Sequence, residues 1–261
     1  MDRVLSAVRS IADKTLSVRR ISQMRKRLRI VTWNCAMALR RKLREVASLD
    51  ADVLVLQECS RADADLLKSI GLKLACWTGN NQYKGLALAA KPELKLTARG
   101  VRGIQWAISG ATGNGSLLGI VAIWACATEN SEERYIRQVH KLLDRGVLEA
   151  LPAASVFLGD FNSNTIWDRM HRELNHSRAV EKFDLAGYKS AYHGLRDEPQ
   201  GKEATPTFFL QRNRKKPYHI DHAFLSPQMR RDLRKVEIGK PAAWLQLSDH
   251  MPFSIEISQR R

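Results

Sequence analysis

Short apolar runs that end in acidic or amide side chains recur along the chain. Three of these runs, RIVTWN, ADVLVLQE and VFLGD, end at Asn34, Glu58 and Asp160. Asn162 follows the third run two residues later. Short apolar runs rich in β-branched residues are typical of strands that are buried on both faces or packed in a sandwich. The pattern therefore predicts buried strands whose ends carry polar groups.

Two later runs repeat the arrangement. The run YHIDHAFLS carries Asp221, and Asp249 and His250 come directly before PFSIEIS. Because burying an unpaired carboxylate is costly, repeated carboxylates at strand ends suggest that the ends meet, around a cation or a shared proton. Oxygen-rich groups of this kind suit a hard divalent ion such as magnesium or manganese. The alternative is that each group only closes a turn, as Gly, Asp, Asn and Ser often do.

Helical and hairpin patterns fill the sequence between these runs. We expect helices over residues 39–49, 60–70, 130–143, 165–174 and 178–185. Further short strands are expected over residues 85–91, 93–101, 104–109, 116–127 and 205–211. So many apolar strands need at least two sheets to cover their faces, with helices outside. Neither a linker nor a solenoid-type repeat interrupts the pattern, which favours one layered α/β domain over residues 29–261.

The balance of charge bears on the partner of the protein. The 261 residues include 43 Lys or Arg and 27 Asp or Glu, a formal net charge of +16. Such an excess favours a negatively charged partner: nucleic acid, an anionic membrane surface or a phosphorylated small molecule. Net charge alone also fits a protein that is merely basic and soluble.

The N-terminal segment, residues 1–28, differs in character from the rest. The first 29 residues hold nine Lys or Arg and two Asp, and Val4, Val8, Ile11 and Leu16 would share one face of a helix. We expect a basic, helical arm. It could lie on an anionic membrane, contact nucleic acid or dock on the domain. A mitochondrial transit peptide is a further alternative, against which Asp2 and Asp13 count.

The cysteines point to a reducing compartment. Four are present, and none forms a C-x-x-C pair, which argues against a zinc knuckle. We expect a reduced, cytoplasmic protein, peripheral to a membrane if the arm binds one. No apolar run reaches the length needed to span a bilayer.

The sequence resembles a known superfamily. The elements WN, QE, GDFN, IDH and SDH occur in that order between about Leu28 and Ile257, and together they are similar to the endonuclease/exonuclease/phosphatase superfamily. The resemblance implies a DNase I-like, four-layer α/β/β/α sandwich, in which two packed mixed sheets are flanked by helices. It places an active site at the edge where strand ends from both sheets converge.

The resemblance also implies roles for the strand-end residues. Magnesium, or manganese in its place, would be held by Asn34, Glu58 and Asp249. The implied catalytic residues are Asp160, Asn162, Asp221 and His250. Asp160 would orient or deprotonate the attacking water and Asn162 would donate to a phosphoryl oxygen, while Asp221 would fix the ring of His250.

Candidate substrate contacts are less well defined. Trp124 stands where the family often has a histidine or tyrosine, and an indole cannot transfer a proton at neutral pH. Lys84 precedes a predicted strand and could touch a phosphate, while Asn164 and Trp167 follow the GDFN element and could line a groove. The basic segment 212–216 is expected to form a hairpin loop able to bind a phosphate backbone.

These observations predict a divalent-metal-dependent phosphodiesterase, a nuclease that acts on DNA or RNA by in-line attack of water. One alternative is a phosphatase or phospholipase of the same fold, acting on inositol phosphates or sphingomyelin-like lipids. Another is a nucleic-acid-binding protein without catalysis, which Trp124 alone supports. The sequence gives no sign of an obligate protein partner.

Overall fold

The computed structural model describes residues 27–113, 117–128, 133–171 and 173–258. The basic arm expected over residues 1–28 lies outside them, apart from its last two residues, which begin the first strand. In the described part, no helix is both long enough and apolar enough to cross a membrane.

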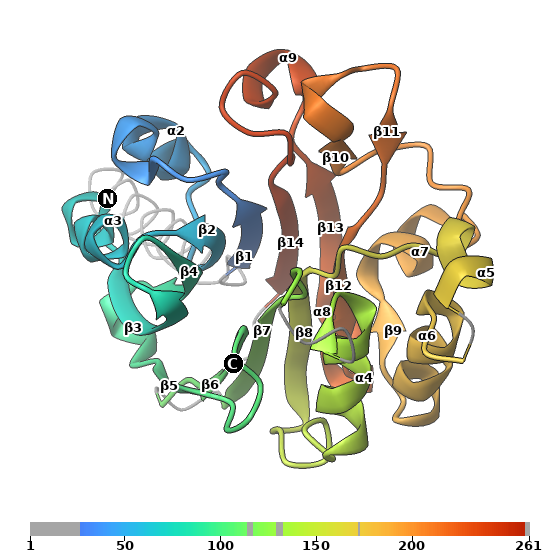
Figure 1. Ribbon diagram of the computed structural model, residues 1–261. Helices are drawn as coiled ribbons and strands as arrows, with labels where there is room; N and C mark the ends of the chain where they lie inside the picture. The colour runs from blue at the N-terminus through green and yellow to red at the C-terminus, as the bar shows by residue number, and fades with distance from the viewer. Residues whose placement is uncertain (1–26, 114–116, 129–132, 172, 259–261) are drawn as a thin grey trace, which may run out of the picture.

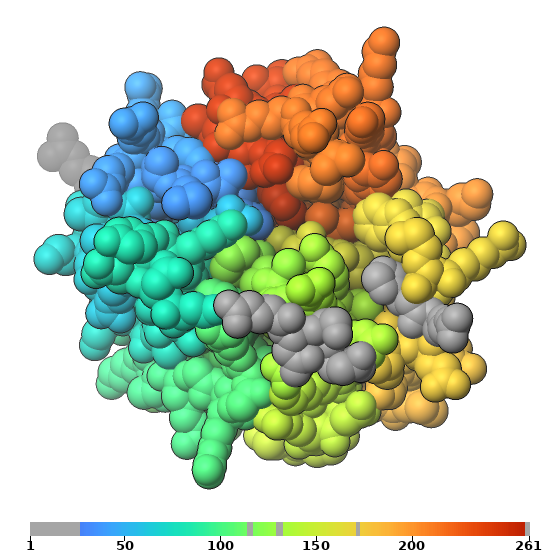
Figure 2. All heavy atoms as spheres, viewed as in Figure 1, coloured from blue at the N-terminus to red at the C-terminus, as the bar shows by residue number. Residues whose placement is uncertain are grey.

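Two six-stranded mixed sheets form the centre of the molecule (Figure 1). The first has the order β13-β14-β1-β2-β4-β3. Its strands are β1 (Arg27–Asn34), β2 (Val53–Cys59), β3 (Lys73–Asn81), β4 (Lys84–Ala90), β13 (Leu233–Ile238) and β14 (Phe253–Ser258). The pair β1 and β2 is parallel, and all other neighbours are antiparallel. The pairing of β14 with β1 joins the two ends of the described chain, and Figure 2 shows the first third of the chain (blue to cyan) beside the last third (orange to red).

The second sheet has the order β5-β6-β7-β8-β12-β9. Its strands are β5 (Thr97–Gly100), β6 (Ala107–Ala111), β7 (Leu118–Trp124), β8 (Ala154–Asp160), β9 (Lys189–Ser190) and β12 (Asp221–Leu225). Here β7 and β8 are parallel, and the remaining pairs are antiparallel. A separate two-stranded ribbon, β10 (Phe208–Phe209) with β11 (Pro217–Tyr218), carries the basic segment between its strands, as expected.

Helices surround the two sheets (Figure 1). They are α2 (Leu43–Ser48), α3 (Arg61–Ala64), α4 (Ile136–Asp144), α5 (Asp168–His171), α6 (His176–Leu185), α7 (Ala191–Arg196), α8 (Pro227–Asp232) and α9 (Pro241–Trp244). Of these, α2 covers the outer face of the first sheet and α4 and α6 that of the second, while α7 and α8 add side chains to the core between the sheets. Short 3-10 turns, η1 (Leu39–Arg41), η2 (Asp65–Ile70), η3 (Pro92–Leu94), η5 (Thr165–Trp167) and η6 (Leu210–Arg212), complete the layers. The expected cap at Ser60 is present, because its side chain accepts a hydrogen bond from the Asp63 N–H.

Three apolar cores separate the four layers. The central core lies between the sheets and takes one face of each strand, with Ile30, Leu88, Ile120 and Leu158 among its buried members. A second core joins β7, β8 and β12 to α4 and α6. A third joins β1, β2 and β4 to α2 and the turns around it. Because alternate strand residues enter different cores, both faces of the central strands are apolar, as their sequences predicted.

Some elements differ from the sequence prediction. The strand β13 was not predicted, because three of its six residues, Arg234, Lys235 and Glu237, are charged, as is typical of an exposed edge strand. The helix expected over residues 39–49 is split into η1 and α2 by Lys42, which has non-helical dihedrals. The short helices α8 and α9 were also not predicted; each has a proline in its first turn.

Candidate active site

The strand register brings the polar strand ends to one edge of the two sheets. Because β1 and β2 are parallel, Asn34 at the end of β1 lies opposite Gln57, next to Glu58. In the second sheet Trp124 pairs with Asp160, and Asp221, the first residue of the antiparallel strand β12, pairs with Asp160 from the other side. The expected convergence of strand ends is therefore confirmed.

The backbone is strained at two of these positions. Glu58 and Asn162 have φ angles of 56° and 46°, in the left-handed region that residues other than glycine rarely adopt. At Glu58 the departure coincides with an irregularity in the pairing of β2 with β4. At Asn162 it folds the chain back, so that the backbone N–H donates to Asp160 Oδ1 at 2.9 Å. Each side chain is thereby directed to the strand edge instead of into a core.

Asp160 lies at the centre of the site. Its Oδ2 accepts hydrogen bonds from Asn34 Nδ2 at 3.1 Å and from Asn162 Nδ2 at 3.2 Å. Asn34 Nδ2 also lies 3.3 Å from Glu58 Oε1, so this amide links the two sheets. His250 Nε2 lies 3.8 Å from Asp160 Oδ2. The side chain of Asp160 is fully buried, so these polar groups are its immediate environment.

His250 is fixed by Asp221. His250 Nδ1 lies 2.9 Å from Asp221 Oδ2, which leaves Nε2 facing Asp160. The backbone is held as well: Trp33 Nε1 donates to the His250 carbonyl, and the His250 N–H donates to Ser248 Oγ. A carboxylate on one ring nitrogen sets the tautomer and the orientation of an imidazole.

Burial and charge shift the protonation of this pair. Burial raises the pKa of Asp160 to about 7, because the attraction of His250 offsets the loss of water only in part. For His250, burial by itself would lower the pKa, but the charges of Asp221 and Asp160 outweigh it and raise the pKa to about 10. With protein groups alone, His250 is therefore an imidazolium at neutral pH. Asp160 titrates in the range that suits a general base.

The donor set fits a divalent cation. One ligand atom from each of Asp160, Asp221 and His250 lies within 4.8 Å of the others. Because a protonated imidazole cannot coordinate a metal, the two carboxylates are the members of this set that would hold a cation while His250 is an imidazolium. Asp221 Oδ1 is buried and has no hydrogen-bond partner among the described residues. Burying an unpaired carboxylate oxygen is costly, and a bound cation would remove that cost. Glu58 adds a further carboxylate across the sheet junction. Asn34, expected as a ligand, instead directs its amide nitrogen at Glu58 and Asp160, while its Oδ1 accepts from the Ala36 N–H. Oxygen-rich sets of this kind suit hard cations.

Asp249, expected as a metal ligand, makes hydrogen bonds with Ser248 and Phe209. Its Oδ1 lies 3.4 Å from Ser248 Oγ, and its carbonyl accepts from the N–H of Phe209. Its charge contributes to the raised pKa of His250. The structure thus places Asp249 beside the pair of His250 and Asp221, while direct contacts join Asn34, Glu58, Asp160 and Asn162.

Two supporting residues were missed in the sequence. Ser248 Oγ donates to the Asn34 carbonyl at 2.7 Å and so ties β1 to the segment that carries His250. Lys42 Nζ contacts the carbonyls of Cys35 and Met37, in a loop where Ala36, Met37 and Ala38 all have positive φ. Ser248 belongs to the SDH element, for which only the acid and the histidine were given roles, whereas no sequence pattern singles out Lys42.

The four candidate substrate contacts fall into two groups. Lys84 and Trp124 meet at the site: Lys84 Nζ lies 3.1 Å from Glu58 Oε2 and 5.0 Å from the centre of the Trp124 ring. Trp124 itself packs edge-on against Trp106. Trp167 instead packs on Tyr218, with ring centres 5.1 Å apart.

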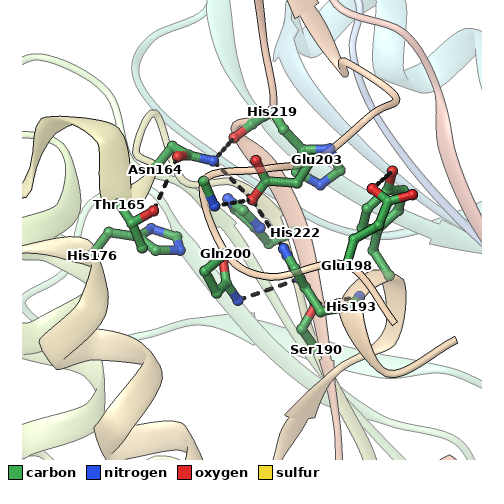
Figure 3. Close-up of polar contacts among 12 residues, drawn as sticks. Asn164, Thr165, His176, Ser190, His193, Glu198, Gln200, Glu203, His219 and His222 are labelled. Carbon is green, nitrogen blue, oxygen red and sulfur yellow. Dashed lines mark hydrogen bonds and ion pairs between the residues drawn. The ribbon is translucent and has the colours of Figure 1, made fainter. Parts of the chain in front are cut away.

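The amide of Asn164 is engaged inside the protein. It donates to Glu203 Oε1 and to the His219 carbonyl, and its oxygen accepts from the Ile166 N–H. Glu203 belongs to a cluster of the buried residues His176, His219 and His222 and the partly buried His193, which forms an ion pair with Glu203 (Figure 3). In β12, His222 follows Asp221 directly, so its side chain points to the opposite face of the strand, toward this cluster. Its members come from four separate segments of the chain, so no local sequence pattern predicts it.

The comparisons with known proteins agree with this geometry. Residues 31–250 match the model of the endonuclease/exonuclease/phosphatase family. None of the curated proteins compared with the chain matches it. Among solved structures, the chain is similar to a 3′ phosphatase, NExo, from Neisseria, bound to a product DNA hairpin, with 21% identity over 89% of this chain and 100% of that chain and a TM-score of 0.68.

Two further structures are similar. One is the AP endonuclease LMAP from Leishmania major, with 16% identity over 90% of this chain and 89% of that chain and a TM-score of 0.69. The other is TDP2 from D. rerio complexed with a single-strand DNA product, with 17% identity over 90% of this chain and 100% of that chain and a TM-score of 0.65. At these identities the structural matches establish the DNase I-like fold alone. With the family match over residues 31–250, the chain belongs to the endonuclease/exonuclease/phosphatase family.

Proposed function

We propose that this phosphoester hydrolase is a nuclease that cleaves phosphodiester bonds of DNA, with magnesium or manganese as the cofactor. The observation that carries the proposal is the buried constellation of Asp160, His250 and Asp221, joined through Asn34 to Glu58. Acids, amides and an oriented imidazole around one point are what the hydrolysis of a charged ester requires.

Each side chain then has a distinct task. A bound divalent cation supplies charge neutralisation at a phosphate oxygen. Asp160 orients the attacking water and accepts its proton, for which a pKa of about 7 is well suited. Asn162 and Asn34 direct amide groups to the same point, where negative charge grows on the phosphoryl oxygens. His250, held as an imidazolium by Asp221, stabilises that charge instead of removing a proton.

A nucleic acid is the substrate that best fits the charge. The net charge is +16, and the segment Arg212–Lys216 is exposed between β10 and β11. This segment is close to the site, because Phe208 in β10 forms an isolated bridge with His250. Two of the similar structures, NExo from Neisseria and TDP2 from D. rerio, are complexes with product DNA. These observations favour a polyanionic strand over a small phosphate ester.

The proposal is tested with a panel of labelled substrates. Duplex DNA, single-stranded DNA, DNA with a 3′-phosphate, abasic duplex, RNA, inositol phosphates and sphingomyelin vesicles are each incubated with Mg²⁺, Mn²⁺ or EDTA. We expect turnover of a DNA substrate that requires the cation. Turnover of an inositol phosphate or a lipid, with DNA left intact, would replace the proposal by the phosphatase or phospholipase alternative.

A further inference from the structure

The ammonium group of Lys84 occupies a position that a cation on Glu58 would also need. Lys84 Nζ lies 3.1 Å from Glu58 Oε2, while Oε1 lies 3.3 Å from Asn34 Nδ2. Both carboxylate oxygens of Glu58 are therefore engaged by protein donors. Because positive charges repel, Glu58 can coordinate a cation through Oε2 only when Lys84 moves away.

Lys84 is free to make this move. Its side chain is 39% exposed and stands at the start of β4, next to the exposed Tyr83. The ammonium already lies 5.0 Å from the centre of the Trp124 ring. The face of an indole attracts a cation, so Trp124 keeps the ammonium near the site when it leaves Glu58.

A hollow beside these residues is suited to an anion. A cavity of about 350 Å³ is bordered by Glu58, Lys84, Trp106, Trp124, Asn80 and Asn162. Trp106 Nε1 is a buried donor for which the described part of the chain offers no acceptor. The Lys84 ammonium and the side-chain amides of Asn80 and Asn162 around one cavity are complementary to a phosphate, whereas the buried Trp106 N–H could reach it only after a shift of the ring.

We propose that Lys84 couples cation binding to substrate binding. Lys84 neutralises Glu58 until a divalent cation takes its place, and it then pairs with a phosphate group of the substrate in this cavity. The identity of that phosphate rests on the proposed function, whereas the displacement of Lys84 from Glu58 does not. Because coupling is reciprocal, cation and phosphate each strengthen the binding of the other through Lys84.

The displacement is tested without substrate. Mn²⁺ binding is titrated by electron paramagnetic resonance for the full chain and for Lys84→Met, Lys84→Arg and Lys91→Met. Removing the ammonium should tighten Mn²⁺ binding about fivefold, the effect expected for a partly exposed ion pair. Lys84→Arg should bind as the wild type does. Lys91 is a matched control, because it pairs with Asp50 and Asp52 at the opposite end of β4.

The pairing of Lys84 with a substrate phosphate is tested by the binding of a fluorescent single-stranded oligonucleotide. Anisotropy is measured with EDTA and with Mn²⁺ in a His250→Gln background, with and without Lys84→Met. We expect Mn²⁺ to tighten oligonucleotide binding, and Lys84→Met to reduce that tightening about fivefold.

The outcomes separate this inference from the proposed function. Equal Mn²⁺ affinity in Lys84→Met and the wild type overturns the displacement and leaves the nuclease proposal standing. An undiminished effect of Mn²⁺ on oligonucleotide binding overturns the role in phosphate binding. A chain that binds no Mn²⁺ in any variant contradicts the proposed function itself.

Discussion

Acid should destabilise the fold through the buried histidine cluster, and His176 is the member for which the effect can be calculated. His176 belongs to the cluster drawn in Figure 3, and its side chain is 1% exposed. Its Nδ1 lies 3.1 Å from Ser163 Oγ, and its Nε2 has no partner in the described part of the chain. Burial lowers the pKa of His176 from 6.5 to about 4. Burial likewise lowers the pKa of His222, whose ring centre lies 4.7 Å away.

The sign follows from proton linkage. Between pH 6.5 and 4 the unfolded chain binds a proton at His176 that the folded chain does not, so stability falls as the pH falls. Above pH 6.5 the full contribution is present, and below about pH 4 the loss levels off. A shift from 6.5 to about 4 corresponds to about 3 kcal/mol, since one pKa unit is about 1.4 kcal/mol.

The assay is urea unfolding in EDTA at pH values from 7.5 to 4.5, for the wild type and His176→Gln. Glutamine keeps a hydrogen-bonding group for Ser163 and does not titrate. Between these limits the free energy of unfolding of the wild type should fall by roughly 2–3 kcal/mol more than that of the variant. Carboxylates contribute equally to both proteins and cancel. Parallel pH profiles would show that His176 is not held neutral by burial.

Three other predictions concern the site and its supports. His250→Gln should lower kcat about 100- to 1,000-fold in a steady-state assay with labelled DNA, because a charged donor to the phosphate is lost; a change confined to KM would count against this role. Gly159→Ala should prevent stable folding, because φ is +147° and the new Cβ would lie 2.0 Å from the Ile123 carbonyl oxygen; an unchanged thermal melt would contradict it. Lys215→Ala should reduce the salt dependence of DNA binding, lowering the slope of log K against log[salt] by about 1; an unchanged slope would place Lys215 away from the strand.

Much of the fold could be predicted, because the hydrophobic pattern is strong where strands are buried on both faces. The apolar runs that end at Asn34, Glu58 and Asp160 correspond to β1, β2 and β8. The polar residue at the end of each run also indicates which side chain lies at the edge of the sheet. The edge strand β13 was missed because its charged side chains interrupt the hydrophobic pattern from which the other strands were predicted.

Contacts set by register or by folding of loops could not be predicted. The sequence suggests that Lys84 touches a phosphate, but its ion pair with Glu58 depends on the pairing of β2 with β4. The engagement of Asn164 by Glu203 depends on the segment between α7 and β10, which lacks regular structure. The contact of Lys42 with the loop after β1 depends on the positive φ angles of Ala36, Met37 and Ala38. Alanine and methionine rarely adopt such angles, so the sequence does not predict this loop.

The most direct measurement is single-turnover cleavage of a 5′-labelled DNA duplex by the wild type and Asp160→Asn, each with Mg²⁺ and with EDTA. Asparagine preserves the size of the side chain and removes the charge and the proton acceptor at the centre of the constellation. We predict cleavage by the wild type only with Mg²⁺, and a rate at least about 1,000-fold lower for Asp160→Asn, with an unchanged circular dichroism spectrum. Cleavage by Asp160→Asn at the wild-type rate, or cleavage that persists in EDTA, would contradict the assignment of this site.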